Sequence, residues 1–267
     1  MRVALLGGGR MGEALARGWC ASGYEPADLV VAEVDPERRR ELVAVLDGVR
    51  VVPSPAWAVA DAGTVVVAVK PGDVAAVLEA AASSLAADAL VISIAAGVTL
   101  AALEASAPGR PIVRAMPNTP AVVGRGAAAI AGNAAATDAD LDRAQALLES
   151  VGTVVQVPER LLDAVTGLSG SGPAYVFLVA EAMIDAGVLV GLPRPAAREL
   201  VVQTLLGAAT LLAESGESPE SLRAGVTSPG GTTAAGLMVL EDRGLRAALM
   251  EAVAAAAARS AELGGGV

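Results

Sequence analysis

The residues Gly7 to Gly12 have the spacing G-x-G-x-x-G, and they stand between an apolar run and a stretch with helical periodicity. In that setting the first glycine permits a tight turn and the second lets the backbone approach a diphosphate. The third glycine lets the helix pack closely on the strand, and the helix N-terminus supplies amides and a positive dipole for an anion. We therefore expect a dinucleotide to bind here, on Leu6, Gly7, Gly8, Gly9, Arg10, Met11 and Gly12.

Glu33 ends the next apolar run, about 20 residues after the last glycine of this motif. A carboxylate at that spacing binds the adenosine ribose hydroxyls and repels a 2′-phosphate. Arg38, Arg39 and Arg40 follow within two helical turns and could instead attract that phosphate, although a solvated helix face is the simpler interpretation. The residues favour NADH and leave NADPH open.

Lys70 is the only lysine of the chain, whose other basic residues are all arginine. It follows the predicted strand Thr64 to Val69, at the carboxyl end where open α/β folds bind their ligands. A strong composition bias would also leave one lysine by chance, so both interpretations carry similar weight.

Two glycine-rich strings occur in the second half of the chain, Ser169 to Pro173 and Ser228 to Thr233, and each precedes a predicted helix. Such strings are most often a cap and a turn. The second string also offers consecutive amides and two hydroxyls at a helix N-terminus, which suits a small carboxylate. A dinucleotide site and a carboxylate site together favour a dehydrogenase for a small acid.

The composition excludes several other chemistries. The chain has no histidine, which removes the commonest general base and most zinc sites, so we expect no metal and a cofactor that carries the chemistry. A formal net charge of −10 argues against nucleic acid as a partner. The single cysteine, Cys20, cannot form an internal disulfide. With neither a signal peptide nor a clear membrane span, we expect a cytoplasmic protein.

Strands and helices alternate through the first half of the chain, which predicts a parallel sheet covered on both faces. The expected strands are Arg2 to Leu6, Leu29 to Glu33, Arg50 to Val52, Thr64 to Val69, Leu90 to Ile94 and Pro111 to Arg114, closed by Ala127 to Ala131 and Thr153 to Val157. The expected helices between them are Arg10 to Ser22, Asp35 to Leu46, Val74 to Leu85, Leu100 to Ala105 and Asp138 to Ser150.

From Leu161 onward only helical signals occur, which predicts a division into residues 1–160 and 161–267. The expected helices are Pro173 to Val190, Arg194 to Glu214, Pro219 to Ala224, Thr232 to Glu241 and Gly244 to Leu263. The first is apolar nearly all round and must be buried, yet about 100 residues of helix hardly bury so much apolar surface alone. We infer an obligate homodimer, within which this half packs against a second copy.

Six strings of the chain resemble, in the same order, those of the pyrroline-5-carboxylate reductase family, which catalyses the last step of proline biosynthesis. They are Gly7 to Gly12, Ala68 to Pro71, Ser93 to Thr99, Arg114 to Pro120, Asp163 to Tyr175 and Thr227 to Thr233. The resemblance implies an α/β Rossmann-type dinucleotide-binding domain followed by an all-α dimerisation domain. It also implies homodimers that assemble into a homodecamer, a pentamer of dimers.

The resemblance further implies reduction of Δ1-pyrroline-5-carboxylate to L-proline by NADPH or NADH. It adds cofactor contacts at Ala68, Val69, Lys70, Pro71, Ala95 and Ala96. It places the substrate on Ser228, Gly230, Gly231, Thr232, Thr233 and Glu159. Relatives often have a polar residue where this chain has Gly225, so a side-chain contact made there in relatives is in doubt.

The missing histidine agrees with this chemistry, because hydride transfer to a protonated imine gives a neutral amine without a strong acid. We expect Thr233 to orient the ring nitrogen or relay a proton. One alternative is a 3-hydroxy-acid dehydrogenase with Lys70 as proton donor, which leaves the Ser228 to Thr233 string unexplained. The other is a non-catalytic dinucleotide sensor, which needs no second anion site.

Overall fold

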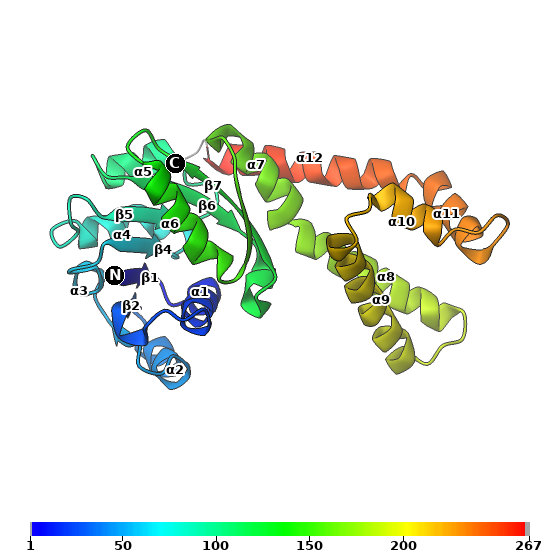
Figure 1. Cartoon of the computed structure of the whole chain (residues 1–267), viewed down its shortest axis with the longest axis horizontal. Helices are drawn as coiled ribbons and strands as arrows, with labels where there is room; N and C mark the ends of the chain where they lie inside the picture. The colour runs from blue at the N-terminus through cyan, green and yellow to red at the C-terminus, as the bar shows by residue number, and fades with distance from the viewer. Residues whose placement is uncertain (1, 265–267) are drawn as a thin grey trace. The chain divides into compact units, whose positions relative to one another are not determined.

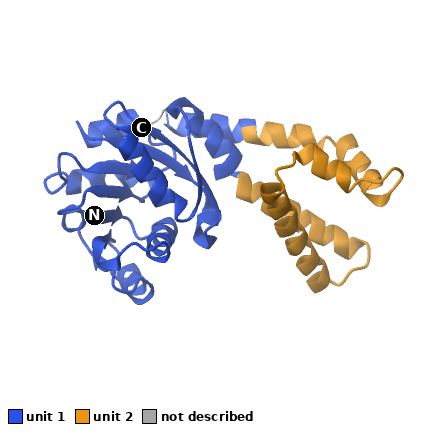
Figure 2. Ribbon diagram, in the orientation of Figure 1, with its two compact units in different colours: residues 1–171, 254–267 blue, residues 172–253 orange. Residues whose placement is uncertain are grey.

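The computed structural model describes residues 2–264 and contains two compact units, coloured separately in Figure 2. Unit 1 comprises the chain up to Ser171 together with the segment from Ala254 onward, and unit 2 comprises Gly172–Val253. The division predicted from the sequence falls at residue 160, whereas the compact units divide after Ser171 and again after Val253. The last helix, α12 (Leu245–Gly264), therefore contributes residues to both units.

Unit 1 is built on an eight-stranded sheet with the order β3-β2-β1-β4-β5-β6-β7-β8 (Figure 1). The strands are β1 (Val3–Leu6), β2 (Leu29–Ala32), β3 (Arg50–Val52), β4 (Thr64–Val67), β5 (Leu90–Ser93), β6 (Ile112–Pro117), β7 (Gly126–Gly132) and β8 (Gly152–Gln156). Strand β1 lies between β2 and β4, so the strand order reverses there, and a crevice opens at the carboxyl ends of these strands. The predicted Rossmann-type fold is confirmed.

The predicted parallel sheet contains one antiparallel pair of strands. Strands β6 and β7 are antiparallel, with Ala115 opposite Ile130, whereas β7 and β8 are parallel again. The segment between β6 and β7 holds only the short helical turn Thr119–Val123. A parallel crossover needs a dozen or more residues, so this short link reverses the chain direction, while helix α6 provides the longer link from β7 to β8.

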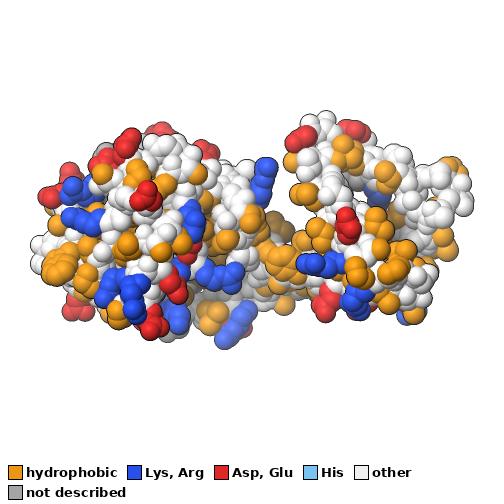
Figure 3. All heavy atoms as spheres, turned by 90° about the horizontal axis from the view of Figure 1, so that it is seen from below, with side chains coloured by type: hydrophobic (Ala, Val, Ile, Leu, Met, Phe, Trp, Pro, Cys, Tyr) orange, Lys and Arg blue, Asp and Glu red, His pale blue; other side chains and the backbone are white. Residues whose placement is uncertain are grey.

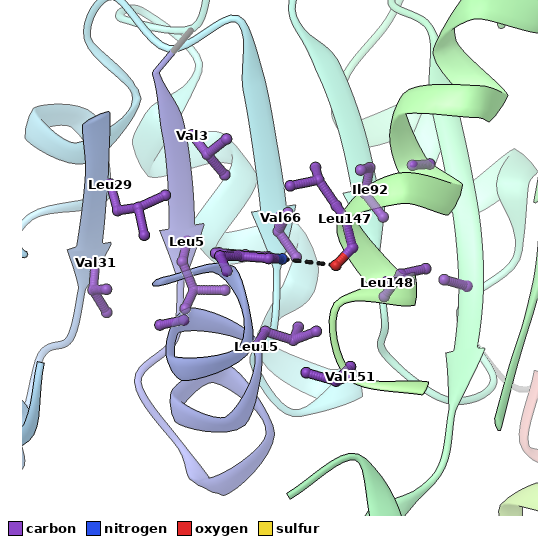
Figure 4. Packing of buried hydrophobic residues seen from close by; sticks show 14 of the residues in the cluster. Val3, Leu5, Leu15, Leu29, Val31, Val66, Ile92, Leu147, Leu148 and Val151 are labelled. Atoms are coloured by element: carbon purple, nitrogen blue, oxygen red, sulfur yellow. Dashed lines mark hydrogen bonds between the residues drawn. The ribbon is translucent and has the colours of Figure 1, made fainter. Parts of the chain in front are cut away.

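The two faces of the sheet carry separate apolar cores, because successive strand residues point to opposite sides. Val3 and Leu5 face one core, and Ala4 and Leu6 face the other. Helices α1 (Arg10–Ala21), α2 (Pro36–Val45) and α6 (Asp138–Glu149) contribute to the first core, and α3 (Pro55–Val59), α4 (Val74–Ala81) and α5 (Leu100–Ser106) contribute to the second. In the first core, shown in Figure 4, the indole of Trp19 donates to the carbonyl of Leu147 at 2.8 Å.

Several helices begin where the sequence places a capping residue. Asp35 caps α2 by accepting a hydrogen bond from the amide of Glu37 at 2.9 Å, and Pro36 occupies the first turn. Thr137 and Asp140 form a reciprocal capping box at the start of α6. These local signals explain why the predicted helix starts agree with the structure to within one or two residues.

The string Ser169 to Pro173 is not a loop, contrary to the sequence expectation. Helix α7 (Leu162–Val165) continues into a π-helical turn over Thr166–Gly170 and then into α8 (Gly172–Leu189). The hydroxyls of Thr166 and Ser169 donate to carbonyls four residues earlier, so they follow the helix instead of capping a new one. Gly170 lies against the terminal methyl of Met116, which would have to shift to admit a Cβ.

Unit 2 consists of helices alone. It contains α8, α9 (Arg194–Glu214), α10 (Pro219–Gly225), α11 (Thr232–Asp242) and the first part of α12. Helices α8 and α9 are joined by a short turn, and Gly187 of α8 lies close to Ala197 of α9. An ion pair of 2.6 Å between Asp185 and Arg194 links the same two helices.

Apolar side chains remain on the surface of these helices, and on the face seen in Figure 3 they gather over unit 2. Helices α8 and α11 contain no buried residue in the described chain, and α9 buries only Ala197 and Val201. The stretches Glu159–Leu189 and Arg194–Glu214 are long and apolar enough to cross a membrane. Length and composition alone are weak evidence for a membrane span. The single chain leaves unit 2 with apolar faces that require a partner or another apolar environment.

Candidate functional site

The fingerprint turn joins β1 to α1. Gly7 adopts φ +106°, a conformation that side chains rarely take, and a Cβ there would lie 2.6 Å from the carbonyl oxygen of Ala68. A Cβ on Gly12 would collide with the carbonyl of Gly7, so helix and strand approach each other closely only without side chains at these two positions. Both glycines are therefore required by the backbone itself.

Gly9 is different, because a Cβ there would meet nothing within 4 Å. It precedes α1, and no side chain caps the helix at this position. The first amides of α1 thus face open space, as a site for a diphosphate requires. The turn fits a dinucleotide.

A cleft of about 370 Å³, here called the first cleft, lies over this turn. Its lining comprises Gly7, Gly9, Ala32, Glu33, Val34, Pro55, Ala68, Val69, Lys70, Asp73 and Val77. Most of these residues lie at or directly after the carboxyl ends of β1, β2 and β4, which meet at the switch in strand order, and Pro55 of α3 and Val77 of α4 complete the lining. The first cleft thus brings together the fingerprint, Glu33 and the Val69-Lys70 string that the sequence predicted separately.

The carboxylate of Glu33 is held in place by two main-chain amides. Its Oε2 accepts a hydrogen bond from Gly8 at 3.0 Å, and its Oε1 accepts one from Asp35 at 2.9 Å. A Cβ on Gly8 would collide with the side chain of Leu42 and approach Glu33. Gly8, which occupies the variable position between the first two motif glycines, therefore supports the acidic residue, a role that the sequence pattern does not reveal.

None of the three arginines after Glu33 is among the residues that line the first cleft. Arg38 donates to the carbonyl of Gly8 at 2.8 Å and forms ion pairs with Glu13 and Glu41. Arg39 donates through one nitrogen to two carbonyls, and together with Arg40 it lines a separate shallow hollow beside α2. The charge of Arg38 is thus largely neutralised within the protein.

Burial raises the pKa of Glu13, but the hydrogen bonds from Arg38 and Arg17 outweigh it, so the pKa of Glu13 lies below its ordinary value. This carboxylate therefore stays charged and keeps Arg38 in position behind the fingerprint.

A second cleft of about 380 Å³ includes Pro71, the neighbour in sequence of Lys70, which lines the first cleft. Its lining comprises Pro71, Ala96, Gly97, Thr166, Ser171, Ala256, Arg259, Ser260 and Leu263. All of these residues belong to unit 1. The structure thus adds Arg259 and Ser260 of α12 to the candidate site. The sequence analysis missed them, although they directly follow the alanine run Ala254 to Ala258.

The remaining predicted cofactor residues lie around the clefts without lining either of them. Leu6 and Ala95 are buried in the apolar core, Met11 packs against it, and Arg10 is exposed at the start of α1. These side chains can therefore act on the cofactor only by holding the main chain beside the clefts in place.

Glu159 already has partners within unit 1. Its Oε1 accepts hydrogen bonds from the amide of Leu100 at 2.7 Å and from Arg114 at 3.1 Å. Arg114 also lies 3.8 Å from Asp163, whose Oδ1 accepts the hydroxyl of Ser260 at 2.7 Å. These contacts give Glu159 a structural role, and its predicted contact with substrate stays a prediction.

The predicted carboxylate loop, Ser228 to Thr233, belongs to unit 2, whereas both clefts belong to unit 1. Gly230 adopts φ +69°, and Gly231 is the uncapped residue before α11, so the first amides of α11 are unoccupied by any side chain. A Cβ on Gly231 would collide with the hydroxyl of Ser228. Thr232 and Thr233 stand in the first turn of α11, and binding of a carboxylate at this helix start stays a prediction.

No group of three or more residues suited to hold a metal occurs among residues 2–264.

Comparisons with known proteins agree with this geometry. A family model described as pyrroline-5-carboxylate reductase dimerisation matches residues 159–263, and one described as NADP oxidoreductase, coenzyme F420-dependent, matches residues 2–97. A pyrroline-5-carboxylate reductase of Synechocystis sp. is 48% identical over 99% of this chain and 98% of its own. One of Mycobacterium tuberculosis is 45% identical over 98% of this chain and 96% of its own.

Two solved structures are also similar. The pyrroline-5-carboxylate reductase of Coxiella burnetii has a TM-score of 0.93 and 36% identity, covering 98% of each chain. The pyrroline carboxylate reductase of Plasmodium falciparum, solved with NADP bound, has a TM-score of 0.87 and 31% identity, covering 99% of this chain and 98% of its own.

Proposed function

The chain belongs to the pyrroline-5-carboxylate reductase family, and from this premise we propose how its clefts and its carboxylate loop carry out the reaction. The activity is the NAD(P)H-dependent reduction of Δ1-pyrroline-5-carboxylate to L-proline. The observation that carries the assignment is a complete dinucleotide turn in a chain 48% identical to such a reductase along its whole length.

The adenosine half of the coenzyme is assigned to the first cleft, with its ribose beside Glu33 and its diphosphate on the amides after Gly9. The nicotinamide half is assigned to the second cleft, past Pro71 and against Ala96. When bound, the reduced nicotinamide supplies the hydride that the imine carbon accepts. The compact cation Lys70 lines the first cleft and favours the negative charge of the diphosphate.

NADH is the better coenzyme of this chain on our proposal. The carboxylate of Glu33 lines the first cleft and is fixed there by two amides, so a 2′-phosphate beside it would be repelled. Arg38 is already paired with Glu13 and Glu41, and Arg39 donates to the carbonyls of Glu33 and Val34. The cation that would be needed to bind the 2′-phosphate of NADPH is therefore already bound to other groups of the protein.

The substrate carboxylate is assigned to the loop Ser228 to Thr233, through the amides of Gly230, Thr232 and Thr233 and the hydroxyl of Ser228. The amide of Gly231 donates to the carbonyl of Ser228 at 3.0 Å, so it shapes the loop without facing the substrate. Thr233 carries the one catalytic role, in which its hydroxyl orients the ring nitrogen or relays a proton. Hydride transfer to the protonated imine discharges a cation, so positioning and fixed dipoles are sufficient and no strong acid is required.

Self-association through unit 2 follows from the dimerisation family that covers residues 159–263. The apolar stretches of α8 and α9 lie within this match, so we propose that a second copy covers them and that the homodimer is cytoplasmic. A pentamer of dimers, as the sequence resemblance implies, is our proposal for the full assembly.

The test follows the absorbance of reduced nicotinamide with purified protein and racemic Δ1-pyrroline-5-carboxylate, comparing NADH and NADPH at equal concentration. We expect rapid oxidation with a higher rate for NADH. The variant Glu33→Ser should lower the ratio of the NADH rate to the NADPH rate about tenfold, because both ribose binding and phosphate repulsion are lost. Absence of oxidation in protein that binds either coenzyme would overturn the proposed function.

A further inference from the structure

Arg114 is a buried cation that no step of the proposed reaction uses. It extends from β6, and its side chain is only 7% exposed. Its guanidinium lies 3.1 Å from Glu159 and 3.8 Å from Asp163, and it lines neither cleft. Buried charges are costly unless they are paired, so this arrangement calls for a reason.

The carboxylates of Glu159 and Asp163, which both contact Arg114, form hydrogen bonds to different walls of the second cleft. Glu159 accepts the amide of Leu100, the first residue of α5, three positions after the cleft residue Gly97. Asp163 accepts the hydroxyl of Ser260, which itself lines the cleft and is the one buried residue of the described part of α12.

Asp163 also belongs to α7, and this helix continues into the π-helical turn with Thr166 and then reaches Ser171. Both of these residues line the same cleft. Three walls of the second cleft, formed by the loop after β5, the turn after α7 and the end of α12, are therefore connected through one guanidinium.

We propose that Arg114, Glu159 and Asp163 are positioning residues that set the spacing of these three walls, and thereby the orientation of the nicotinamide ring, without touching either reactant. The inference rests on the proposed function, because it takes the second cleft as the nicotinamide site. Misplacement of a reacting group by about 1 Å costs on the order of a hundredfold in rate, so a small change in wall spacing has a large effect on turnover.

The experiment compares Arg114→Met, Arg114→Lys and Glu159→Gln with the parent. Arg114→Met keeps the length of the side chain but leaves both carboxylates without their cation, and Arg114→Lys keeps the charge. Leu147→Ala is the stability-matched control, because it removes a buried side chain of α6 that lines neither cleft. Thermal unfolding of all four variants shows how much stability each has lost.

Two readouts separate positioning from general stability. The first is calorimetric binding of ADP-ribose, which lacks the nicotinamide, against binding of NADH. Arg114→Met should bind ADP-ribose within about twofold of the parent and bind NADH at least about fivefold more weakly. The second is kcat with its primary deuterium isotope effect from 4-deuterated NADH. We expect kcat to fall by about tenfold to a hundredfold and the isotope effect to rise, with recovery in Arg114→Lys.

Equal loss of affinity for both ligands, or a loss of kcat no larger than in Leu147→Ala at the same melting temperature, would overturn the inference. The binding comparison needs no turnover. If the parent failed to reduce the imine while NADH still bound more weakly to Arg114→Met and ADP-ribose did not, the proposed substrate would be wrong and the positioning cluster would stand.

Discussion

Units 1 and 2 of this chain differ in how they bury their apolar side chains. Unit 1 covers both faces of its sheet with its own helices, and Leu5 and Leu6 of the same strand are buried in two different cores. In unit 2, Phe177 and Leu178 of α8 are 67% and 66% exposed. The coenzyme unit thus carries its own hydrophobic stabilisation, whereas the helical unit depends on association with a second copy.

The largest effect is expected from placing charge on the apolar face of α8, which tests whether unit 2 depends on a second copy. The double variant Phe177→Glu, Leu178→Glu should abolish the dimer and almost all activity, because unpaired carboxylates cannot enter an apolar interface. Size-exclusion chromatography with light scattering measures the mass directly. The control, Val122→Glu, Val123→Glu, places the same two charges on exposed apolar residues of unit 1 and should leave the mass unchanged. A dimer that persists in the double variant would refute the assignment of this face.

The next prediction tests whether substrate and coenzyme are held by different units. Thr233→Ala should lower kcat/KM for the imine about a hundredfold, while the dissociation constant for NADH stays within about twofold. Thr233→Ser keeps the hydroxyl and should recover most of the loss. Steady-state kinetics and calorimetry give the two quantities. Unchanged kinetics in Thr233→Ala would remove this hydroxyl from the mechanism.

Substitutions at two glycines of the fingerprint turn should affect different properties of unit 1, one the binding of NADH and the other the stability of the fold. Gly9→Val adds a side chain toward open space, so it should weaken NADH binding at least about tenfold with little change in melting temperature. Gly12→Val forces a side chain against the carbonyl of Gly7 and should destabilise the fold by about 1–3 kcal/mol or more. Calorimetry and thermal unfolding distinguish the two effects. Equal destabilisation by both changes would contradict the open space above Gly9.

The smallest effect is expected at Glu13. Its pKa is lower in the folded protein than in the unfolded chain, so its contribution to stability is present above the ordinary glutamate pKa and disappears as the pH falls through the folded value. Glu13→Gln should therefore cost about 0.5 kcal/mol near neutral pH, and its difference from the parent should vanish in acid. Urea unfolding at several pH values measures this. A difference that grows in acid would show that the sign is wrong.

Much of unit 1 could be predicted from local patterns. The strand runs, the capping residues Asp35 and Thr137 and the G-x-G-x-x-G spacing act over a few residues, and the structure follows them closely. The helical string Thr166–Gly170 was missed because serines and glycines usually indicate turns. There the side chain of Met116, distant in sequence, fills the space that a Cβ on Gly170 would need.

The sequence by itself determined the fold class, the family and the coenzyme turn, because periodicity and glycine spacing express the local geometry of strand, turn and helix. Only the tertiary structure decided that Glu159 pairs with Arg114 and that Arg38 pairs with Glu13. It alone brought Ser260 beside Asp163, 97 positions away along the chain. Charged side chains find their partners through packing between distant elements, and no local spacing encodes that choice.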